Sequence, residues 1–195
     1  MHAKYFKFLA YFAFLASLIY GFYHILKAFD FVKEAYIYTG IFALIFLNLS
    51  LLFSLCKFKK TKSYPKLLGI FAAFWAFLHF LNYFIFDRNA NFLRLFDDIS
   101  HRLLEASGFF AFAIIFFMFL SSFRVFKKIE KIRKLGYVCL VLASYHYFLS
   151  PKVPMFWEWS ALILSLVYFT IRYLRFLKPK KKLKTDNFTF IEAGI

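Results

Sequence analysis

The stretch LLGIFAAFWAFLHFLNYFIF, from Leu67 to Phe86, decides the fold of this chain. Its 20 residues have no formal charge, and a helix that rises ~1.5 Å per residue crosses a hydrocarbon core of ~30 Å over that length. We therefore predict a transmembrane helix here. Within it lies His79, and an ionisable side chain at such a depth usually faces the interior of a helix bundle. His79 is either a functional ligand or a neutral side chain that hydrogen-bonds to a neighbouring helix.

The composition of the 195-residue chain is that of an integral membrane protein. Hydrophobic residues make up 63% of the chain, aromatic residues make up 25%, and the mean hydropathy is +0.64, far from the average for soluble domains. The net charge of +16 would suggest nucleic acid in a soluble protein. Here the apolar runs favour membrane topology as its cause, so we expect membrane lipids and no nucleic acid as partners. Cys56 and Cys139 lie in apolar runs and no CxxCH motif is present, which argues against a disulfide framework and covalent haem attachment.

Six apolar runs predict six transmembrane helices. The runs cover residues 5–26, 35–56, 67–86, 103–122, 135–149 and 156–176. The fifth is short, so we expect its helix to continue backwards through Ile129 and Ile132. Of the Lys and Arg residues, 20 fall on one face and 6 on the other, and the positive-inside rule then places both termini in the cytoplasm. The predicted fold is all-α: an integral membrane bundle of six transmembrane helices over residues 1–177, followed by a basic cytoplasmic tail at 178–195.

Two histidines, His79 and His146, are expected at similar depths near the outer face, about 10 Å and about 5 Å from it by helical rise. They lie on two predicted helices that run in the same direction. Two imidazoles arranged in this way can clamp one haem iron from opposite sides, so we predict that domain 1–177 binds haem. The alternative is a pair of separate polar anchors. Zinc is disfavoured, because no third His, Cys or carboxylate occurs at helical spacing beside either residue.

Three further side chains are expected on the face of the helix that presents His79. Trp75, Asn82 and Tyr83 stand four residues before it and three and four residues after it, a spacing that brings side chains to one face. They are candidate cofactor-binding residues, with Asn82 or Tyr83 as a hydrogen-bond partner of the ligand or of a haem propionate. Packing alone also explains the aromatic rings.

The remaining histidines and the segment 87–102 belong to the predicted outer side. His24 is either a spare ligand or an interfacial side chain, and His101, four residues before Glu105, is expected to pair at the surface. An amphipathic helix on the outer interface is predicted by the 4, 3, 4 spacing of Phe92, Phe96, Ile99 and Leu103. This helix is either a docking surface for an extracytoplasmic redox partner or a solvated lid over the bundle.

Several motifs resemble the ferric-reductase-like transmembrane family, and within it the small haem-binding subunits of periplasmic methionine sulfoxide reductase systems. The third predicted helix contains the family's LG...W..LH...Y pattern as Leu68-Gly69, Trp75, Leu78-His79 and Tyr83. Further matches are Thr39-Gly40 with Ala43-Leu44, Leu120-Ser121-Ser122, and Tyr137 with His146-Tyr147. The resemblance covers roughly residues 35 to 175.

The sequence departs from the family pattern at two positions. Where the family has a second histidine in its fifth helix, 13 residues before the outer one, this chain has Arg133, and Ile37 replaces a histidine of the second helix. A guanidinium cannot ligate iron, although it can bind a propionate or phosphate group. The resemblance therefore implies one haem b on the outer-leaflet side, held by His79 and His146, with Arg133 as a further cofactor-binding candidate.

The resemblance implies electron transfer across the bacterial inner membrane. The chain would be an electron-transfer subunit rather than the catalytic one, and would pass electrons from quinol or a cytoplasmic flavin reductase to a periplasmic molybdenum-containing subunit that reduces methionine sulfoxide in proteins. Quinone and FMN are further cofactor candidates, although the sequence contains no GxGxxG motif and no P-loop. Two alternatives stay open: a stand-alone ferric-reductase-like cytochrome, and a non-redox transporter or assembly protein.

Overall fold

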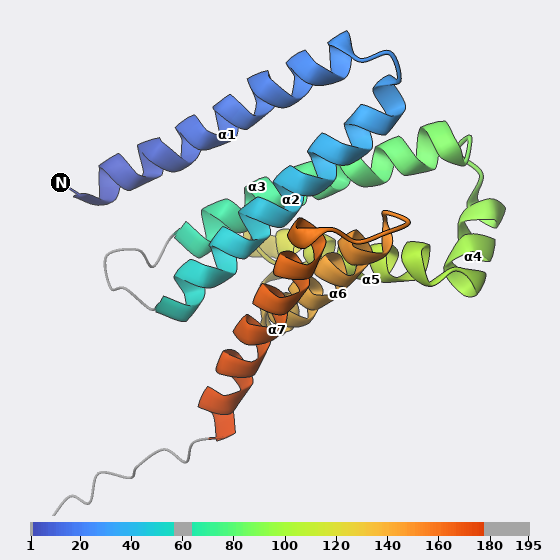
Figure 1. The fold of residues 1–195 in the computed structure, drawn as a ribbon. Coiled ribbons are helices and arrows are strands. Elements are labelled where there is room, and N and C mark those ends of the chain that lie inside the picture. Colours follow the sequence, from blue (N-terminus) through green and yellow to red (C-terminus); the bar gives the residue numbers. More distant parts are fainter. Residues whose placement is uncertain (1, 57–63, 178–195) are drawn as a thin grey trace, which may run out of the picture.

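The computed structural model describes residues 2–56 and 64–177, and within these ranges the regular structure is entirely helical (Figure 1). The elements are α1 (His2–Lys27), α2 (Phe31–Cys56), α3 (Tyr64–Asn82), the π-helical turn η2 (Tyr83–Asp87), α4 (Phe92–His101), α5 (Leu103–Leu120), the 3-10 helix η3 (Arg124–Leu135), α6 (Gly136–Leu149) and α7 (Phe156–Leu177). The all-α prediction is confirmed for these residues. The predicted basic tail, 178–195, lies outside them.

Within the described ranges, four helices are long and apolar enough to cross a membrane. They are Tyr5–Lys27, Phe31–Cys56, Tyr64–Asp87 and Leu103–Leu120. The helix α6 has only 14 residues, which is shorter than a perpendicular span needs, and α7 includes Glu158 and Arg172. The chain is thus a multi-pass membrane protein. The count of six spans and the side on which the termini lie stay predictions.

The helices pack as two groups that meet in the middle of the bundle. The most extensive contacts join α2 to α3, α5 to α6 and α6 to α7, while α3 with α5 and α2 with α6 form smaller contacts between the groups. The helix α1 lies along the outside of α2, and α4 crosses the end of the bundle where η2 leads into α5 (Figure 1). Most side chains of α1 are exposed, as expected for a helix that faces lipid.

Two predicted helices are continuous but change their winding. The fifth continues backwards through Ile129 and Ile132 as predicted, but these residues belong to the 3-10 helix η3, which is interrupted at Phe126 (φ −101°, ψ 23°). Its lysines and arginines cannot enter a hydrocarbon core at low cost. The third predicted helix changes to a π-helical turn after Asn82, a local change of winding that is frequent at functional sites.

The predicted amphipathic helix is present as α4. It begins at Asn91, whose side-chain oxygen accepts hydrogen bonds from the backbone nitrogens of Leu93 (2.9 Å) and Arg94 (3.3 Å), a typical N-cap. The buried face of α4 does not coincide with the predicted apolar face: Leu95 is buried, whereas Phe92 and Phe96 of the predicted face are exposed. Those rings face outward from the bundle, where an interfacial helix would contact lipid.

Candidate functional site

The structure places His79 of α3 and His146 of α6 next to each other. Their ring centroids are 6.0 Å apart and their planes are nearly perpendicular, at 89°. Two imidazole nitrogens that each bind one metal ion at ~2 Å leave ring centroids roughly 6 Å apart. The observed separation therefore suits one metal centre between the rings. These residues come from helices that are 67 positions apart in sequence, so only tertiary packing brings them together.

Each imidazole has a hydrogen-bond contact at its Nδ1 atom, and the backbone of Tyr36 is a further hydrogen-bond partner of His79. In His79, Nδ1 lies 3.1 Å from Oγ1 of Thr39 on α2. In His146, Nδ1 lies 2.8 Å from the backbone carbonyl oxygen of Leu104 on α5. Among the described residues we find no hydrogen bond to Nε2 of either ring. Nε2 is thus the nitrogen that each ring has available for a metal, and the Nδ1 contacts fix the orientation of the rings.

A glycine lies behind each ring. A Cβ atom added at Gly40 of α2 would lie 3.1 Å from Cε1 of His79, and one added at Gly108 of α5 would lie 2.7 Å from both Cε1 and Nδ1 of His146. The second distance is too short for real atoms, so a side chain at Gly108 would displace the ring. The place of His146 therefore depends on the missing side chain of Gly108, whereas a side chain at Gly40 would require only a small shift of His79.

Tyr36 links His79 to the end of the bundle. Its ring meets the imidazole edge-on, with centroids 5.4 Å apart and planes at 77°, and its hydroxyl donates a hydrogen bond of 2.6 Å to Oδ2 of Asp87 in η2. Sequence analysis did not select Tyr36. One wall of the site therefore comes from α2, which contributes Tyr36, Thr39 and Gly40.

Trp75 does not lie against the histidine pair. Its side chain is fully buried, its Nε1 donates a hydrogen bond of 3.2 Å to Oγ of Ser17 on α1, and its ring contacts Phe42 at a centroid distance of 5.0 Å. The contacts of Trp75 hold α1 to the bundle. Its predicted place in a cofactor wall has no support from these contacts.

Asn82 and Tyr83 are also bonded to other elements. The amide of Asn82 donates to the backbone oxygen of Val32 at 2.9 Å. The hydroxyl of Tyr83 donates to Oδ2 of Asp98 at 2.7 Å and accepts from Nε of Arg88 at 3.1 Å. Arg88 and Asp98 also form an ion pair. These bonds attach the end of α3 to α2 and α4.

The ion pairs around Asp98 alter the titration of groups outside the spans. The pKa of Arg88 is raised, first by its hydrogen bond with Tyr83 and further by the nearby Asp98 carboxylate, although burial acts to lower it. For Asp98, burial acts to raise the pKa, but the hydrogen bond from Tyr83 and the charges of Arg88 and Arg102 outweigh it and lower the pKa. Asp98 is therefore an ionised anchor for α4 at neutral pH.

Arg133 lies at the opposite end of α6 from His146. Its Nε donates to Oγ of Ser121 at 3.0 Å, its second terminal nitrogen donates to the Ser121 carbonyl at 2.7 Å, and its first pairs with Glu130 at 3.0 Å. The guanidinium thus donates hydrogen bonds to acceptors at the carboxyl end of α5. The structure does not bring Arg133 to the histidine pair.

The other histidines have different surroundings. The His24 ring lies among tyrosines, 4.5 Å from Tyr20 and 5.3 Å from Tyr38 between centroids. His101 pairs with Asp97, whose Oδ1 lies 3.1 Å from Nδ1, and not with Glu105, which pairs with Arg102 at 2.8 Å. In residues 2–56 and 64–177 no group of three or more His, Cys, Asp or Glu side chains could hold a metal ion.

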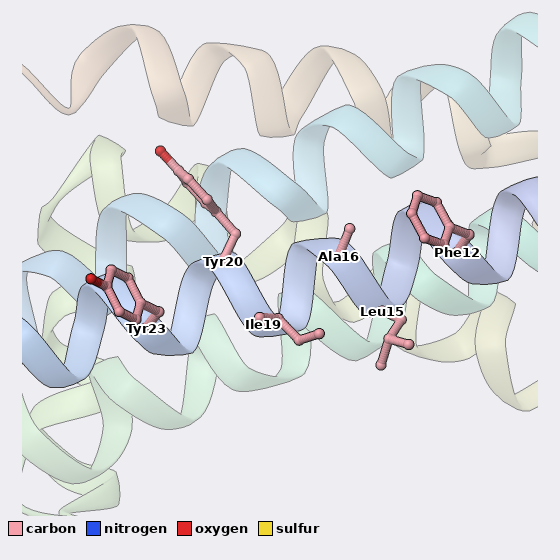
Figure 2. Close-up of a pocket in the computed structure, with 6 residues that line it drawn as sticks. All are labelled: Phe12, Leu15, Ala16, Ile19, Tyr20 and Tyr23. Carbon is pink, nitrogen blue, oxygen red and sulfur yellow. The ribbon is translucent and has the colours of Figure 1, made fainter.

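An apolar hollow on α1 lies apart from the histidine pair. It is lined by side chains that all project from this one helix: Phe12, Leu15, Ala16, Ile19, Tyr20 and Tyr23 (Figure 2). A depression formed by one exposed, apolar helix is what lipid chains fill in a membrane. It adds no polar group to the site.

Comparison with known proteins indicates a family of membrane proteins. The family model described as "Ferric reductase like transmembrane component" matches residues 39–132, which include α3 and the residues of α2 from Thr39 onward. Over these residues the chain is similar to the class of ferric-reductase-like transmembrane proteins. No solved structure matches it.

A curated relative narrows the class. The protein-methionine-sulfoxide reductase heme-binding subunit MsrQ of Pasteurella multocida (strain Pm70) is 31% identical over 147 residues, which cover 71% of each chain. The chain belongs to the MsrQ family.

Proposed function

We propose that this protein is a haem-binding electron-transfer subunit of the membrane, in which His79 and His146 would hold one haem b. The separation of 6.0 Å between the two ring centroids is the observation that supports this proposal most strongly. The related MsrQ is named as a heme-binding subunit. When bound, the haem would supply one-electron chemistry at its iron.

The residues of the chain would orient and shield this group. Nε2 of each ring would be the ligand atom, since Nδ1 of His79 contacts Thr39 and Nδ1 of His146 contacts the Leu104 carbonyl. Gly40 and Gly108 would leave room for the rings. Trp75, Asn82, Tyr83 and Arg133 would act at a distance, through helix packing, because their side chains bond elsewhere.

The proposed partner follows from the relative. MsrQ is named as a subunit of protein-methionine-sulfoxide reductase, so we propose that this chain, in a bacterial inner membrane with six spans and cytoplasmic termini, passes electrons to a periplasmic molybdenum-containing reductase. Quinol or a cytoplasmic flavin reductase would be the donor. The haem would lie on the periplasmic side, because the histidines are close to α4 and η2, which the predicted topology places there.

The test is haem content with matched histidine variants. Full-length protein from haem-replete cells is expected to show a sharp α-band when reduced and one haem per chain by pyridine haemochrome assay. His79→Ala and His146→Ala should each lose the haem, whereas His24→Ala and His101→Ala should keep it. Colourless wild-type protein would point to the non-redox alternative, and haem retained in both ligand variants would refute the assignment of the ligands.

A stand-alone ferric-reductase-like cytochrome is the second candidate, because the matching family model is described as ferric reductase like. The two functions differ in the electron acceptor. Reduced protein in membranes can be mixed with a ferric chelate, or with a purified periplasmic methionine sulfoxide reductase and its substrate. Rapid reoxidation only in the second mixture supports the subunit role, and rapid reoxidation only by the chelate supports the stand-alone enzyme.

A further inference from the structure

The hydroxyl of Thr39 lies between two polar groups in the bundle interior. Thr39 is only 4% exposed. Its Oγ1 lies 2.5 Å from the backbone oxygen of Ala35, one turn earlier in α2, and 3.1 Å from Nδ1 of His79. A threonine commonly bonds back to the carbonyl four residues before it. The second contact, to the imidazole of another helix, is what calls for an explanation.

The direction of these two hydrogen bonds follows from the number of protons. A hydroxyl has one proton to donate, and a carbonyl oxygen can only accept. The proton of Thr39 is therefore committed to Ala35. The contact with His79 is a hydrogen bond only if Nδ1 of His79 carries a proton and donates it to Oγ1. In a neutral ring this leaves Nε2 without a proton and with a free lone pair.

The same tautomer results at His146 by a different route. Its Nδ1 faces the Leu104 carbonyl at 2.8 Å, so it must donate, and its Nε2 is unprotonated in the neutral ring. The acceptor of His146 is a backbone atom that no substitution removes. At His79 the backbone of Tyr36 is a further hydrogen-bond partner, but the acceptor at 3.1 Å from Nδ1 is the side chain of Thr39, which mutation can remove. The two halves of the site therefore differ in one property that mutation can change.

We propose that Thr39 is a positioning residue that fixes the Nδ1-protonated tautomer of His79 and strengthens the donation of its Nε2 to a bound haem iron. This inference rests on the proposed function. A hydroxyl that is itself donating a hydrogen bond is a better acceptor, because chained hydrogen bonds polarise one another. An acceptor at Nδ1 raises the basicity of the ligand, and a more basic ligand stabilises ferric over ferrous iron, which lowers the reduction potential.

Thr39→Val tests the proposal with little change of shape. It removes the acceptor, and loss of a partner of this kind typically weakens metal binding about 10–100-fold. We expect weaker haem binding and a positive shift of the midpoint potential in full-length protein, with an altered low-temperature EPR spectrum. Thr39→Ser keeps the hydroxyl and should restore the potential. Thr170→Val is the control for the back-bond itself, because Thr170, an exposed residue of α7, bonds in the same way to the Leu166 carbonyl at 2.8 Å.

The outcomes separate this inference from the proposed function. Wild-type protein without haem would refute the function itself. Haem-loaded Thr39→Val with an unchanged potential, or Thr39→Ser that behaves like the valine variant, would overturn only the role of Thr39. If Thr39→Val does not fold, Thr39→Ala takes its place: it also removes the acceptor, and an unchanged midpoint potential in the haem-loaded variant would contradict the inference.

Discussion

Gly108 and His146 are so close that a Cβ atom on the glycine would lie 2.7 Å from two atoms of the imidazole ring. Gly108 is on α5, the same helix whose Leu104 carbonyl binds Nδ1 of the ring. One helix therefore both orients His146 and leaves space for it. The corresponding distance at Gly40 and His79 is 3.1 Å, which a small movement can relieve.

We expect Gly108→Ala to displace His146 and to reduce haem content strongly. Overpacking a well-packed interior costs roughly 1–3 kcal/mol, and the ring is the group that must move. Haem per chain and the thermal unfolding temperature in detergent are the measurements. Gly69→Ala is the control, because a Cβ there would meet Oγ of Ser50 at 3.4 Å, an ordinary contact. Full haem content in Gly108→Ala would contradict the observed packing.

Gly40→Ala should have a milder effect than Gly108→Ala. A Cβ at 3.1 Å from Cε1 of His79 requires a shift of a few tenths of an ångström, which a histidine on an adjacent helix can accommodate. We expect haem binding to persist with a changed absorption or EPR spectrum. The ranking of the two alanine variants in haem affinity is the result to measure, and a reversed order would be inconsistent with these distances.

Trp75→Phe should lower stability without changing the spectrum of the bound haem. The substitution removes the hydrogen bond from Nε1 to Ser17, worth about 1 kcal/mol, and loosens α1. Ser17 keeps its own bond to the Phe14 carbonyl. Thermal unfolding and the reduced spectrum should be compared with those of Trp157→Phe, since Trp157 is exposed. A shifted haem spectrum would instead place Trp75 in the cofactor wall.

The attachment of α4 is expected to depend on pH through Asp98. Because the pKa of Asp98 is lowered in the folded protein, its ionised form contributes stability that is present above the ordinary carboxyl pKa and is lost as the pH falls through the lowered value. The protection of residues 92–101 from hydrogen exchange, relative to the intrinsic rate at each pH, should therefore fall only in acid. Asp98→Asn should raise exchange already at neutral pH, while Asp97→Asn, at an exposed position, should not. Equal protection in both variants would exclude Asp98 as the anchor.

Arg133→Gln should destabilise the protein but leave the haem in place. The guanidinium bonds to Ser121 at the end of α5, and a neutral amide cannot form all of these bonds. Lys131→Gln, at an exposed position, is the comparison. If Arg133→Gln lost haem while its unfolding temperature stayed unchanged, a direct contact between Arg133 and a propionate would be the better explanation.

The sequence was sufficient to predict the helices and the meeting of two histidines, because both depend on runs of hydrophobic residues and on counting residues from the membrane surface. It was not sufficient to assign the neighbours of His79. Trp75, Asn82 and Tyr83 share a broad face with His79, but over two helical turns that face meets three different elements: α1 for Trp75, the start of α2 for Asn82 and α4 for Tyr83.

The residues that support the rings were missed for a related reason. Thr39-Gly40 matches a family motif, but no pattern within α2 indicates which side chain of α3 it touches. Gly108 is a single glycine in an apolar run. Likewise, the run 135–149 gave no indication that a 3-10 helix would precede it, since hydrophobicity reports burial better than the winding of the backbone.

His79 lies on α3 and is supported by α2, whereas His146 lies on α6 and is supported by α5. This arrangement has a consequence for biosynthesis. When α1 to α3 have left the ribosome, His79 already has its threonine and its glycine, but its partner ring is still untranslated. A cofactor that needs both rings can be loaded only after α6 has entered the membrane. Once bound, the cofactor would join α1–α3 to α5–α7. In cells that lack it, these two groups of helices should separate more easily, and the protein should be degraded sooner.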